Sequence, residues 1–320
     1  MPLWLSEADV RAVLALPELI GAMEQALIAF SARGVQQPVR TVIEMRDREF
    51  FALMPAFDSA HTALGAKLVT VVPSNAARGL HTHLAAISLF DPETGELLAV
   101  MDGRYITELR TAAASAVSVR HLARPDAATL AILGSGVQAR SHLEALPLVR
   151  SFREIRAWSP TRDRLVNFAA ESGGRVRAAD SAEQAVRGAD VILVATSSVT
   201  PAIDNAWVKP GSHVIAIGAC RPSQREVDPA LTARARLVVD SSEAALRESG
   251  DVLQGIAEER FTEFHAGTEL GAVAAGSVAG RTSADQVTLF KSLGLAIEDV
   301  TAAAIAYTRA KQAGRGTPLT

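Results

Sequence analysis

A glycine-rich turn near the middle of the chain constrains the fold more than any other feature. The apolar run 128–133 leads directly into Gly134-Ser-Gly136, and Ala139 completes a G-x-G-x-x-A pattern. Gly134 permits a tight turn, Gly136 lets a ligand approach the backbone, and Ala139 lets a helix pack closely on the strand. The pattern therefore predicts a buried strand, a turn and a helix whose N-terminal end attracts anions.

Strand-like runs recur after this turn, mostly with helical segments between them. They span residues 154–158, 175–178, 190–196, 213–217 and 236–240. This alternation predicts an α/β fold of the Rossmann type, a doubly wound parallel sheet. Residues 191–194 and 214–217 are apolar throughout, as expected for strands covered by helices on both faces. In this context the glycine-rich turn predicts a dinucleotide site.

The segment before this region has a different pattern. Two helices are predicted within residues 1–30, the first opened by a capping box of Ser6 and Asp9, the second opened by Pro17 and closed by Gly34. Turn residues 91–95 predict a hairpin. Further predicted elements are strands at 39–45, 50–55, 63–72, 84–90 and 97–101, a helix at 105–122, and a long helix at 285–313 that packs back on this region.

Composition excludes several partners. Lys and Arg number 32 and Asp and Glu 35, so the net charge of −3 leaves no cationic excess for nucleic acid. No uncharged apolar run approaches the roughly 20 residues of a membrane span. The chain shows no secretory signal and has a single cysteine, Cys220, so we expect a cytoplasmic protein. His81 and His83 flank Thr82 without an accompanying carboxylate or cysteine, and we expect no metal site.

The second strand of the predicted sheet indicates which nicotinamide dinucleotide binds. A site for NAD usually ends this strand with an acidic residue, but here the strand runs into Ser159, Thr161 and Arg162. A guanidinium with two hydroxyls suits a 2′-phosphate. We therefore expect NADPH, with NADH as a weaker ligand. The alternative is that Arg162 is only a solvated residue at the start of a helix.

Three cations stand in unusual places. Arg40 and Lys67 lie within strand-like apolar runs, and Arg110 lies at the start of a largely neutral helix. Each alone could be an outward-facing surface charge. Together they suit a small carboxylate, because arginine forms paired hydrogen bonds with it and a lysine with a shifted pKa can move a proton.

Seven segments, taken together, resemble the ornithine cyclodeaminase and mu-crystallin family over nearly the whole chain. They are Gln-Pro-Val-Arg40-Thr, Gly-Ala-Lys67, Gly-Leu-His-Thr82, Leu-Arg110-Thr-Ala-Ala-Ala-Ser, Gly134-Ser-Gly-Val-Gln-Ala, Glu243-Ala-Ala-Leu-Arg-Glu-Ser-Gly-Asp and Phe-Lys-Ser-Leu-Gly294. The resemblance implies a homodimer with two domains and an active site between them. We expect an α+β substrate-binding and dimerisation domain of residues 1–116 with 297–320, and an NADP-binding Rossmann domain of residues 117–296.

The resemblance also implies site residues. Arg40, Lys67 and Arg110 are expected to bind the substrate's carboxylate and reacting centre, with Leu293 beside the substrate. The expected cofactor-binding residues are Gly134, Gly136, Val137, Gln138, Ser159, Thr161, Arg162, Thr82, Thr196, Ser197, Ile217 and Ser292.

The chain departs from the family pattern at one catalytic position. Cyclodeaminases carry an Asp before a Cys-Pro pair, whereas aligning the prolines of Ile217-Gly-Ala-Cys220-Arg-Pro222 places a cysteine there. A thiol with a pKa near 8.5 is a poor substitute for an ionised base. Cys220 is therefore either a catalytic contact or simply a small buried residue. The nearby Asp228 is expected to cap a helix that starts at Pro229.

These features predict an NADPH-dependent reductase of cyclic ketimine carboxylates, which needs less proton transfer than cyclodeamination. The substrates would be Δ1-pyrroline-2-carboxylate or Δ1-piperideine-2-carboxylate, and the products L-proline or L-pipecolate. The alternatives are an ornithine cyclodeaminase, an alanine or N-alkyl amino acid dehydrogenase, and a non-enzymatic NADPH-dependent carrier of a small ligand.

Overall fold

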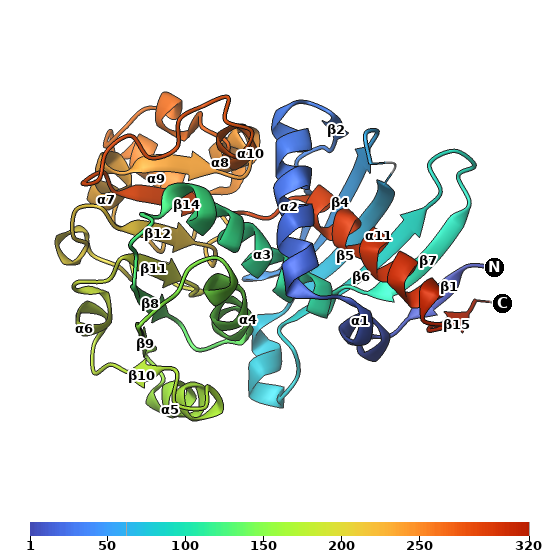
Figure 1. Cartoon of the computed structure of the whole chain (residues 1–320), viewed down its shortest axis with the longest axis horizontal. Helices are drawn as coiled ribbons and strands as arrows, with labels where there is room; N and C mark the ends of the chain where they lie inside the picture. The colour runs from blue at the N-terminus through green and yellow to red at the C-terminus, as the bar shows by residue number, and fades with distance from the viewer. Residues whose placement is uncertain (62, 320) are drawn as a thin grey trace. The chain divides into compact units, whose positions relative to one another are not determined.

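The computed structural model describes residues 1–61 and 63–319, and the chain divides into two compact units (Figure 1). Unit 1 comprises Met1–Arg110 and Gly294–Thr320, and unit 2 comprises Thr111–Leu293. The first part of unit 1 ends at residue 110 and its second part begins at residue 294, whereas the sequence suggested 116 and 297 for these two bounds.

Unit 2 contains the predicted parallel sheet. Its strands pair in the order β10-β9-β8-β11-β12-β14-β13, and every pair is parallel. The order reverses between β8 and β11, which makes the carboxyl ends of these two strands the switch point of a doubly wound sheet. The bounds are β8 (Thr129–Leu133), β9 (Glu154–Trp158), β10 (Arg177–Ala178), β11 (Val191–Val194), β12 (His213–Ala216), β13 (Arg236–Val239) and β14 (Thr288–Lys291). The expected Rossmann-type α/β fold is confirmed.

Helices connect these strands and cover their apolar side chains. Ile192, Val214 and Leu237 belong to one core that also includes residues of the helices. The helices after the glycine-rich turn are α4 (Val137–Ala145), α5 (Arg162–Glu171), α6 (Ala182–Val186), α7 (Pro229–Arg234), α8 (Ser242–Glu248), α9 (Gly250–Ala257) and α10 (Leu270–Ala274), with 3-10 turns η2 (Leu146–Leu148), η3 (Asn205–Trp207) and η4 (Glu263–Ala266). As predicted, the Asp228 side chain caps α7, accepting a hydrogen bond from the Ala230 N–H.

The predicted helix over 285–313 is wrong in its first part. Residues 288–291 form β14, which lies between β12 and β13, and the helix α11 (Ala296–Gln312) begins only after Gly294. All four residues of β14 are buried. A short run buried on both faces lacks a distinguishing periodicity, so it resembles a helix segment in sequence.

Unit 1 is a mixed sheet with helices on one face. The strand order is β15-β1-β7-β6-β5-β4-β2, and β3 also pairs with β4. In Figure 1, α11 crosses β4, β5 and β6, and α2 packs against α11. The predicted return of the tail helix to this region is confirmed. The strands are β1 (Leu3–Leu5), β2 (Val35–Gln36), β3 (Thr41–Arg46), β4 (Glu49–Asp58), β5 (Ala63–Val71), β6 (His83–Phe90), β7 (Leu97–Asp102) and β15 (Thr317–Pro318).

The local signals of unit 1 are mostly confirmed. Ser6 and Asp9 form the capping box of α1 (Glu7–Val13), and β6 and β7 form the predicted hairpin. The remaining helices are α2 (Leu16–Ser31), the 3-10 turn η1 (Pro73–Arg78) and α3 (Arg104–Leu122), which continues into unit 2. The helix α2 ends at Ser31, and the Gly34 N–H closes it by donating to the carbonyl of Ala29 at 2.9 Å, while Arg33 adopts the left-handed conformation with φ of 62°.

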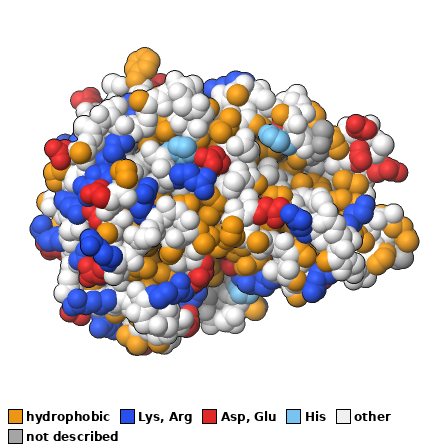
Figure 2. Space-filling view, viewed as in Figure 1, with side chains coloured by type: hydrophobic (Ala, Val, Ile, Leu, Met, Phe, Trp, Pro, Cys, Tyr) orange, Lys and Arg blue, Asp and Glu red, His pale blue; other side chains and the backbone are white. Residues whose placement is uncertain are grey.

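Among the described residues, no single helix combines the length and apolar content of a bilayer span; α1 and α2 reach both only as a pair bent by 91°. On the face shown in Figure 2, Lys and Arg side chains alternate with Asp and Glu over the surface, so this face carries no broad area of one charge.

Candidate functional site

Lys67 lies on the buried face of β5, where it meets a carboxylate from α11. Its side chain is almost fully buried, and its Nζ forms a close ion pair with Oδ2 of Asp299. The neighbouring strand residues Ala66 and Leu68 point to the other face because side chains alternate along a strand. An ammonium in an apolar sheet face is tolerated only with a partner, and Asp299 is that partner.

Arg110, in α3, meets the same acidic helix turn. Its Nε donates to Oδ1 of Asp299 at 2.9 Å, and its Nη1 donates to Oε2 of Glu298 at 2.5 Å. All three side chains are buried. The two carboxylates lie in the first turn of α11, where the helix dipole favours negative charge.

Gly294 connects Arg40 and Arg110. Arg40 Nη2 donates to the carbonyl oxygen of Gly294 at 3.0 Å. A Cβ added at Gly294 would come within 2.5 Å of Arg110 Nη1, so the glycine makes room for that guanidinium. The structure therefore brings Arg40, Lys67 and Arg110 together around the start of α11. Their roles toward a substrate stay predictions.

The surroundings shift the pKa values of these groups. Burial, opposed by Asp299 and assisted by Arg110 and Arg40, lowers the pKa of Lys67 to about 8. Burial alone would raise the pKa of Asp299, but Arg110 and Lys67 hold it below its ordinary value. Burial and the neighbouring cations lower the pKa of His83, on β6, to about 4, so this histidine is neutral near pH 7. Near neutral pH, Lys67 is thus the group whose charge changes most readily.

In unit 2, the glycine-rich turn lies at the switch point of the sheet. Gly134 follows β8 with φ of 130°, and a Cβ there would lie 2.5 Å from the carbonyl oxygen of Ala195, which follows β11. Gly136 is the N-cap of α4, has no side-chain cap, and has no atom within 4 Å of where its Cβ would be. Val137 and Gln138 form the first turn of α4. The open backbone and uncapped helix end fit a pyrophosphate.

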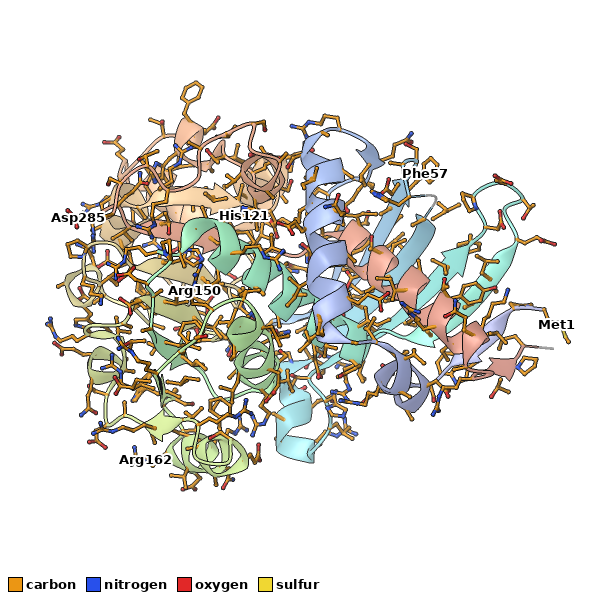
Figure 3. All side chains as sticks on the ribbon, in the orientation of Figure 1. Met1, Phe57, His121, Arg150, Arg162 and Asp285 are labelled. Carbon is orange, nitrogen blue, oxygen red and sulfur yellow. The ribbon has the colours of Figure 1, made fainter. Side chains whose placement is uncertain are left out.

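The residues after β9 lie beside this turn. Ser135 Oγ donates to Ser159 Oγ at 3.0 Å, which ties the two loops together. Thr161 is the N-cap of α5 and makes no side-chain cap bond. Arg162 begins α5 (labelled in Figure 3), donates to the carbonyl of Ala179 at 3.2 Å, and is more than half exposed. Its Nη1 also lies 3.6 Å from Oδ1 of the exposed Asp180, so an anionic ligand here competes with that carboxylate. The role of Arg162 toward a cofactor stays a prediction.

Glu226 is a buried carboxylate that no sequence motif predicted. Its Oε1 accepts hydrogen bonds from the N–H and hydroxyl of Thr196, at 2.7 and 2.9 Å. Its Oε2 accepts from the N–H groups of Gly218 and Ala219, at 2.6 and 2.8 Å. One side chain therefore joins the loops after β11 and β12, which contain three expected cofactor residues, Thr196, Ser197 and Ile217.

The loop after β12 does not present an unpaired acid. Both oxygens of Glu226 are engaged by backbone groups, and Cys220 is half-buried, with its N–H donating to Gln224 Oε1 at 3.1 Å and its Sγ 3.5 Å from the carbonyl of Ile217. Burial and like charge raise the pKa of Glu226. This arrangement provides no obvious base for amine or water activation at Cys220.

The expected site residues Ser292 and Leu293 lie in unit 2, and Thr82 lies in unit 1. Asp240, directly after β13, accepts hydrogen bonds from Ser292 Oγ at 3.1 Å and from the Leu293 N–H at 2.6 Å, and so holds the segment after β14. Thr82 lies in unit 1, exposed just before β6, with its carbonyl accepting from the Val72 N–H. The residues expected to contact cofactor or substrate therefore come from both units.

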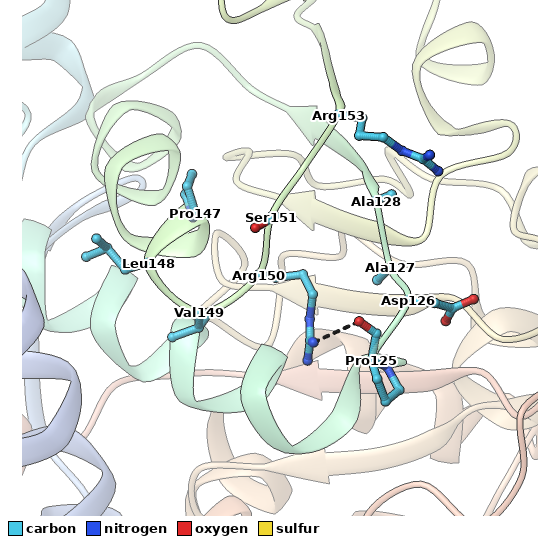
Figure 4. A pocket seen from close by; sticks show the side chains of 10 residues that line it. All are labelled: Pro125, Asp126, Ala127, Ala128, Pro147, Leu148, Val149, Arg150, Ser151 and Arg153. Carbon is cyan, nitrogen blue, oxygen red and sulfur yellow. Dashed lines mark hydrogen bonds between the residues drawn. The ribbon is translucent and has the colours of Figure 1, made fainter.

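The pocket in Figure 4 lies elsewhere in unit 2. Its lining comes from the residues just before β8 and from those between α4 and β9, with Arg150 Nη1 donating to the carbonyl of Pro125 at 3.0 Å. These positions are at the amino ends of β8 and β9. Ligands of doubly wound sheets bind at the carboxyl ends, so this pocket is not part of the candidate site.

No group of three or more His, Cys, Asp and Glu side chains among the described residues is arranged to hold a metal ion. Glu298, Asp299 and Asp240 join the site without having been predicted from the sequence. A usable signal exists for the first two, because Ile297-Glu-Asp-Val300 places paired acids inside an otherwise apolar helix. An acid on a face that must be buried requires a cationic partner.

The chain is similar to known proteins over most of its length. The ketimine reductase mu-crystallin of Rattus norvegicus is 45% identical over 293 residues, which cover 90% of this chain and 91% of that protein. The structure of Thermococcus litoralis Delta(1)-pyrroline-2-carboxylate reductase in complex with NADH and L-proline is 35% identical with a TM-score of 0.95, covering 99% of this chain and 100% of that one. An archaeal alanine dehydrogenase dimer with bound NAD is 32% identical with a TM-score of 0.94, covering 100% and 99%.

The family model gives the same answer as these individual proteins. It matches residues 2–314 and carries the description ornithine cyclodeaminase/mu-crystallin family. The resemblance inferred from the seven sequence segments is thereby confirmed. The chain belongs to the ornithine cyclodeaminase/mu-crystallin family.

Proposed function

We propose that this protein is a reductase of cyclic ketimine carboxylates. It converts Δ1-pyrroline-2-carboxylate or Δ1-piperideine-2-carboxylate to L-proline or L-pipecolate with a reduced nicotinamide cofactor. The observation that carries the proposal is the convergence of Arg40, Lys67 and Arg110 on the start of α11. The names of the rat and Thermococcus relatives support the same substrate class.

The charge of the cluster fits a substrate with one carboxylate. Three cations, Arg40, Lys67 and Arg110, face two anions, Glu298 and Asp299, which leaves one net positive charge when Lys67 is protonated. A single carboxylate neutralises this charge. The guanidinium groups bind it through charge-assisted hydrogen bonds, which fix the orientation of the adjacent carbon.

Lys67 holds the proton that the imine nitrogen needs. Its pKa near 8 keeps most of the ammonium protonated at neutral pH yet makes it a better acid than an exposed lysine. The Lys67 ammonium donates its proton to the imine nitrogen as the hydride reaches the neighbouring carbon, which leaves Lys67 as a neutral amine. The cluster thereby supplies both orientation and acid catalysis.

The cofactor-binding residues lie in unit 2. A bound nicotinamide cofactor supplies the hydride for the reduction. The uncapped N-terminus of α4 and the open backbone at Gly136 hold the pyrophosphate, while Glu226 keeps the Thr196 loop and the Gly218 loop in place. The proposed reaction requires these residues and the cation cluster to act on the same substrate.

For the cofactor, we propose NADPH over NADH. The strand β9 ends at Trp158 and is followed by Ser-Pro-Thr-Arg162. This segment has no carboxylate to hold two ribose hydroxyls. Arg162 and Thr161 instead offer donors to a 2′-phosphate. The two solved relatives contain NADH and NAD, so the preference of this chain is a property that must be measured separately.

We further propose a homodimer formed through unit 1. The face of its sheet opposite α11 exposes Leu53, Leu68 and Leu84 on the adjacent strands β4, β5 and β6, where Leu53 and Leu68 are directly paired. A contiguous apolar face of this kind usually marks an interface. The archaeal alanine dehydrogenase relative is a dimer. Light scattering is expected to give twice the chain mass for the native protein and the chain mass for Leu68→Glu.

Steady-state assays with the purified protein test the proposed reaction. The protein should oxidise NADPH with at least one of the two cyclic imino acids, and it should release no ammonia from ornithine with either cofactor. Ammonia from ornithine would support the cyclodeaminase alternative, and activity restricted to pyruvate with an amine would support the dehydrogenase. Binding of the imino acid without turnover would indicate the carrier. Any of these three results contradicts the proposal.

A further inference from the structure

We propose that Asp299 is the positioning residue of the cation cluster: its carboxylate bonds to Lys67 and Arg110 at once and fixes the spacing of the two cations around the substrate. The assignment of the substrate rests on the function proposed above. The contact geometry of Asp299 does not, because it is a property of unit 1 alone.

The two oxygens of Asp299 serve different cations. Oδ2 pairs with Lys67 Nζ, and Oδ1 accepts from Arg110 Nε at 2.9 Å. The Asp299 side chain is fully buried and that of Lys67 nearly so. Water therefore cannot replace the carboxylate, and any change in its position moves both cations.

Glu298 differs from Asp299 although it precedes it in the same helix turn. Its Oε2 accepts from Arg110 Nη1, and no ion pair with Lys67 is found within the described part of unit 1. Both carboxylates are buried and have the same charge. Glu298 is thus a natural control, because its removal alters the charge near Arg110 but leaves the Lys67 contact intact.

Close packing of α11 on β5 brings Asp299 to Lys67. A Cβ at Gly65 would lie 3.3 Å from Cγ2 of Val300, so the missing side chain lets the helix approach the strand. Gly65 and Lys67 lie on the same strand face, two residues apart. Asp299, adjacent to Val300, is therefore presented to Lys67 by the backbone packing itself.

The groups that face Lys67 explain why the carboxylate matters chemically. They are Asp299 from α11, Arg110 from α3, Arg40 from the segment before β3, and His83 from β6. Of these four groups, Asp299 alone raises the pKa of Lys67, while the two arginines lower it. Without Asp299, Lys67 would lose its proton at lower pH.

Lysine NMR tests this arrangement without any assay of turnover. The chain has four lysines, at positions 67, 209, 291 and 311, so selectively labelled lysine side chains give few signals, and Lys67→Met assigns the one of interest. In Asp299→Asn the titration midpoint of Lys67 should fall by about 1 to 3 pH units. In Glu298→Gln it should stay near the native value. An unchanged midpoint in Asp299→Asn, or equal shifts in the two variants, would overturn the proposal.

A second variant separates position from charge. Asp299→Glu keeps the charge but lengthens the side chain by one methylene, so the Lys67 midpoint should remain closer to native while the KM for the imino acid rises at least several-fold. A native KM in this variant would show that the position of the carboxylate is unimportant, against the proposal. In Asp299→Asn, the alkaline limb of kcat/KM should move with the NMR midpoint. If the midpoint moves and the limb does not, Asp299 still positions Lys67, but the proton-holding role of Lys67 in the proposed reaction is wrong.

Discussion

Gly294 lies directly against Arg110: a Cβ added at Gly294 would come within 2.5 Å of Nη1 and 2.7 Å of Nη2. The same residue accepts a hydrogen bond from Arg40 through its carbonyl oxygen. One glycine therefore sets the positions of two guanidinium groups. Its φ of 83° adds a conformational requirement that other residues meet only with strain.

Gly294→Ala should therefore impair substrate binding more than folding. The added methyl group displaces the Arg110 guanidinium, and we expect the KM for the imino acid to rise about tenfold or more while the Kd of the cofactor is unchanged. Gly314→Ala is the matched control, because Gly314 also has a positive φ, of 61°, but no atom lies within 4 Å of its Cβ position. Both variants should lose about 1 to 2 kcal/mol of stability from backbone strain. Equal KM values in the two would exclude displacement of Arg110.

Lys67→Met should abolish turnover and spare cofactor binding. Methionine fills similar space without the ammonium, and Asp299 retains Arg110 as a partner, so the fold of unit 1 should persist. NADPH fluorescence measures cofactor binding, and the imino acid assay measures turnover. Lys311→Met, at an exposed position of α11, is the control and should behave like the native protein. Loss of NADPH binding in Lys67→Met would mean that the lysine is structural.

Arg162→Ala should weaken NADPH binding selectively. Removing a charged hydrogen bond to a 2′-phosphate costs about 1 to 3 kcal/mol, or roughly 5- to 150-fold in Kd, whereas NADH has a neutral hydroxyl at this position. Arg164→Ala removes an equal charge from the exposed surface of the same helix and controls for general electrostatics. Equal losses for NADPH and NADH would contradict the role of Arg162.

Sequence reasoning identified the nucleotide fold because its signal is local. The residues around Gly134 and Gly136 lie in one continuous strand-turn-helix segment, so their spacing specifies the structure directly. The capping box of α1 and the β6–β7 hairpin are local signals for the same reason. The end of α2 is also local: the Gly34 N–H donates to the carbonyl of Ala29, although Arg33 rather than the glycine takes the left-handed conformation.

The parts missed by sequence reasoning depend on contacts between distant segments. The strand β14 gains its partners β12 and β13 only through the completed sheet, and β1 pairs with β15 from the opposite end of the chain. Lys67 and Arg110 were noticed as charges in apolar runs, but their partner Asp299 lies about two hundred residues away. Burial of these charges required a partner, yet one sequence does not indicate which acid supplies it.

Glu226→Gln should loosen two loops of the nucleotide unit together. An amide presents one acceptor oxygen where the carboxylate presents two, so hydrogen bonds to Thr196 or to Gly218 and Ala219 are lost. We expect a loss of about 1.5 to 3 kcal/mol in unfolding free energy and weaker cofactor binding. Glu243→Gln, on the exposed side of α8, should change neither quantity appreciably. Native cofactor affinity in Glu226→Gln would show that the loops hold without it.

Two buried histidines should make unit 2 sensitive to acid. Burial lowers the pKa of His142 to about 4 and that of His213 to about 3. His142 bonds to Ser115 Oγ at 2.8 Å, and His213 lies 2.9 Å from Thr288 Oγ1. Because the unfolded chain protonates its histidines near pH 6.5 and the folded chain does not, the unfolded state binds more protons below that pH. Stability should therefore fall as the pH decreases from about 6.5 toward 4, by about 2 kcal/mol for each histidine by pH 5.

Denaturant unfolding at a series of pH values measures this slope. His142→Gln keeps a neutral side chain in the same place, so its unfolding free energy should depend less steeply on pH than that of the native protein, whatever its stability at pH 7. His81→Gln, at an exposed position of unit 1, should retain the native slope. The slope is the decisive quantity, because packing defects shift the free energy at every pH equally, whereas proton linkage acts only between the two pKa values. Parallel curves for native protein and His142→Gln would show that the buried imidazole takes up its proton without unfolding.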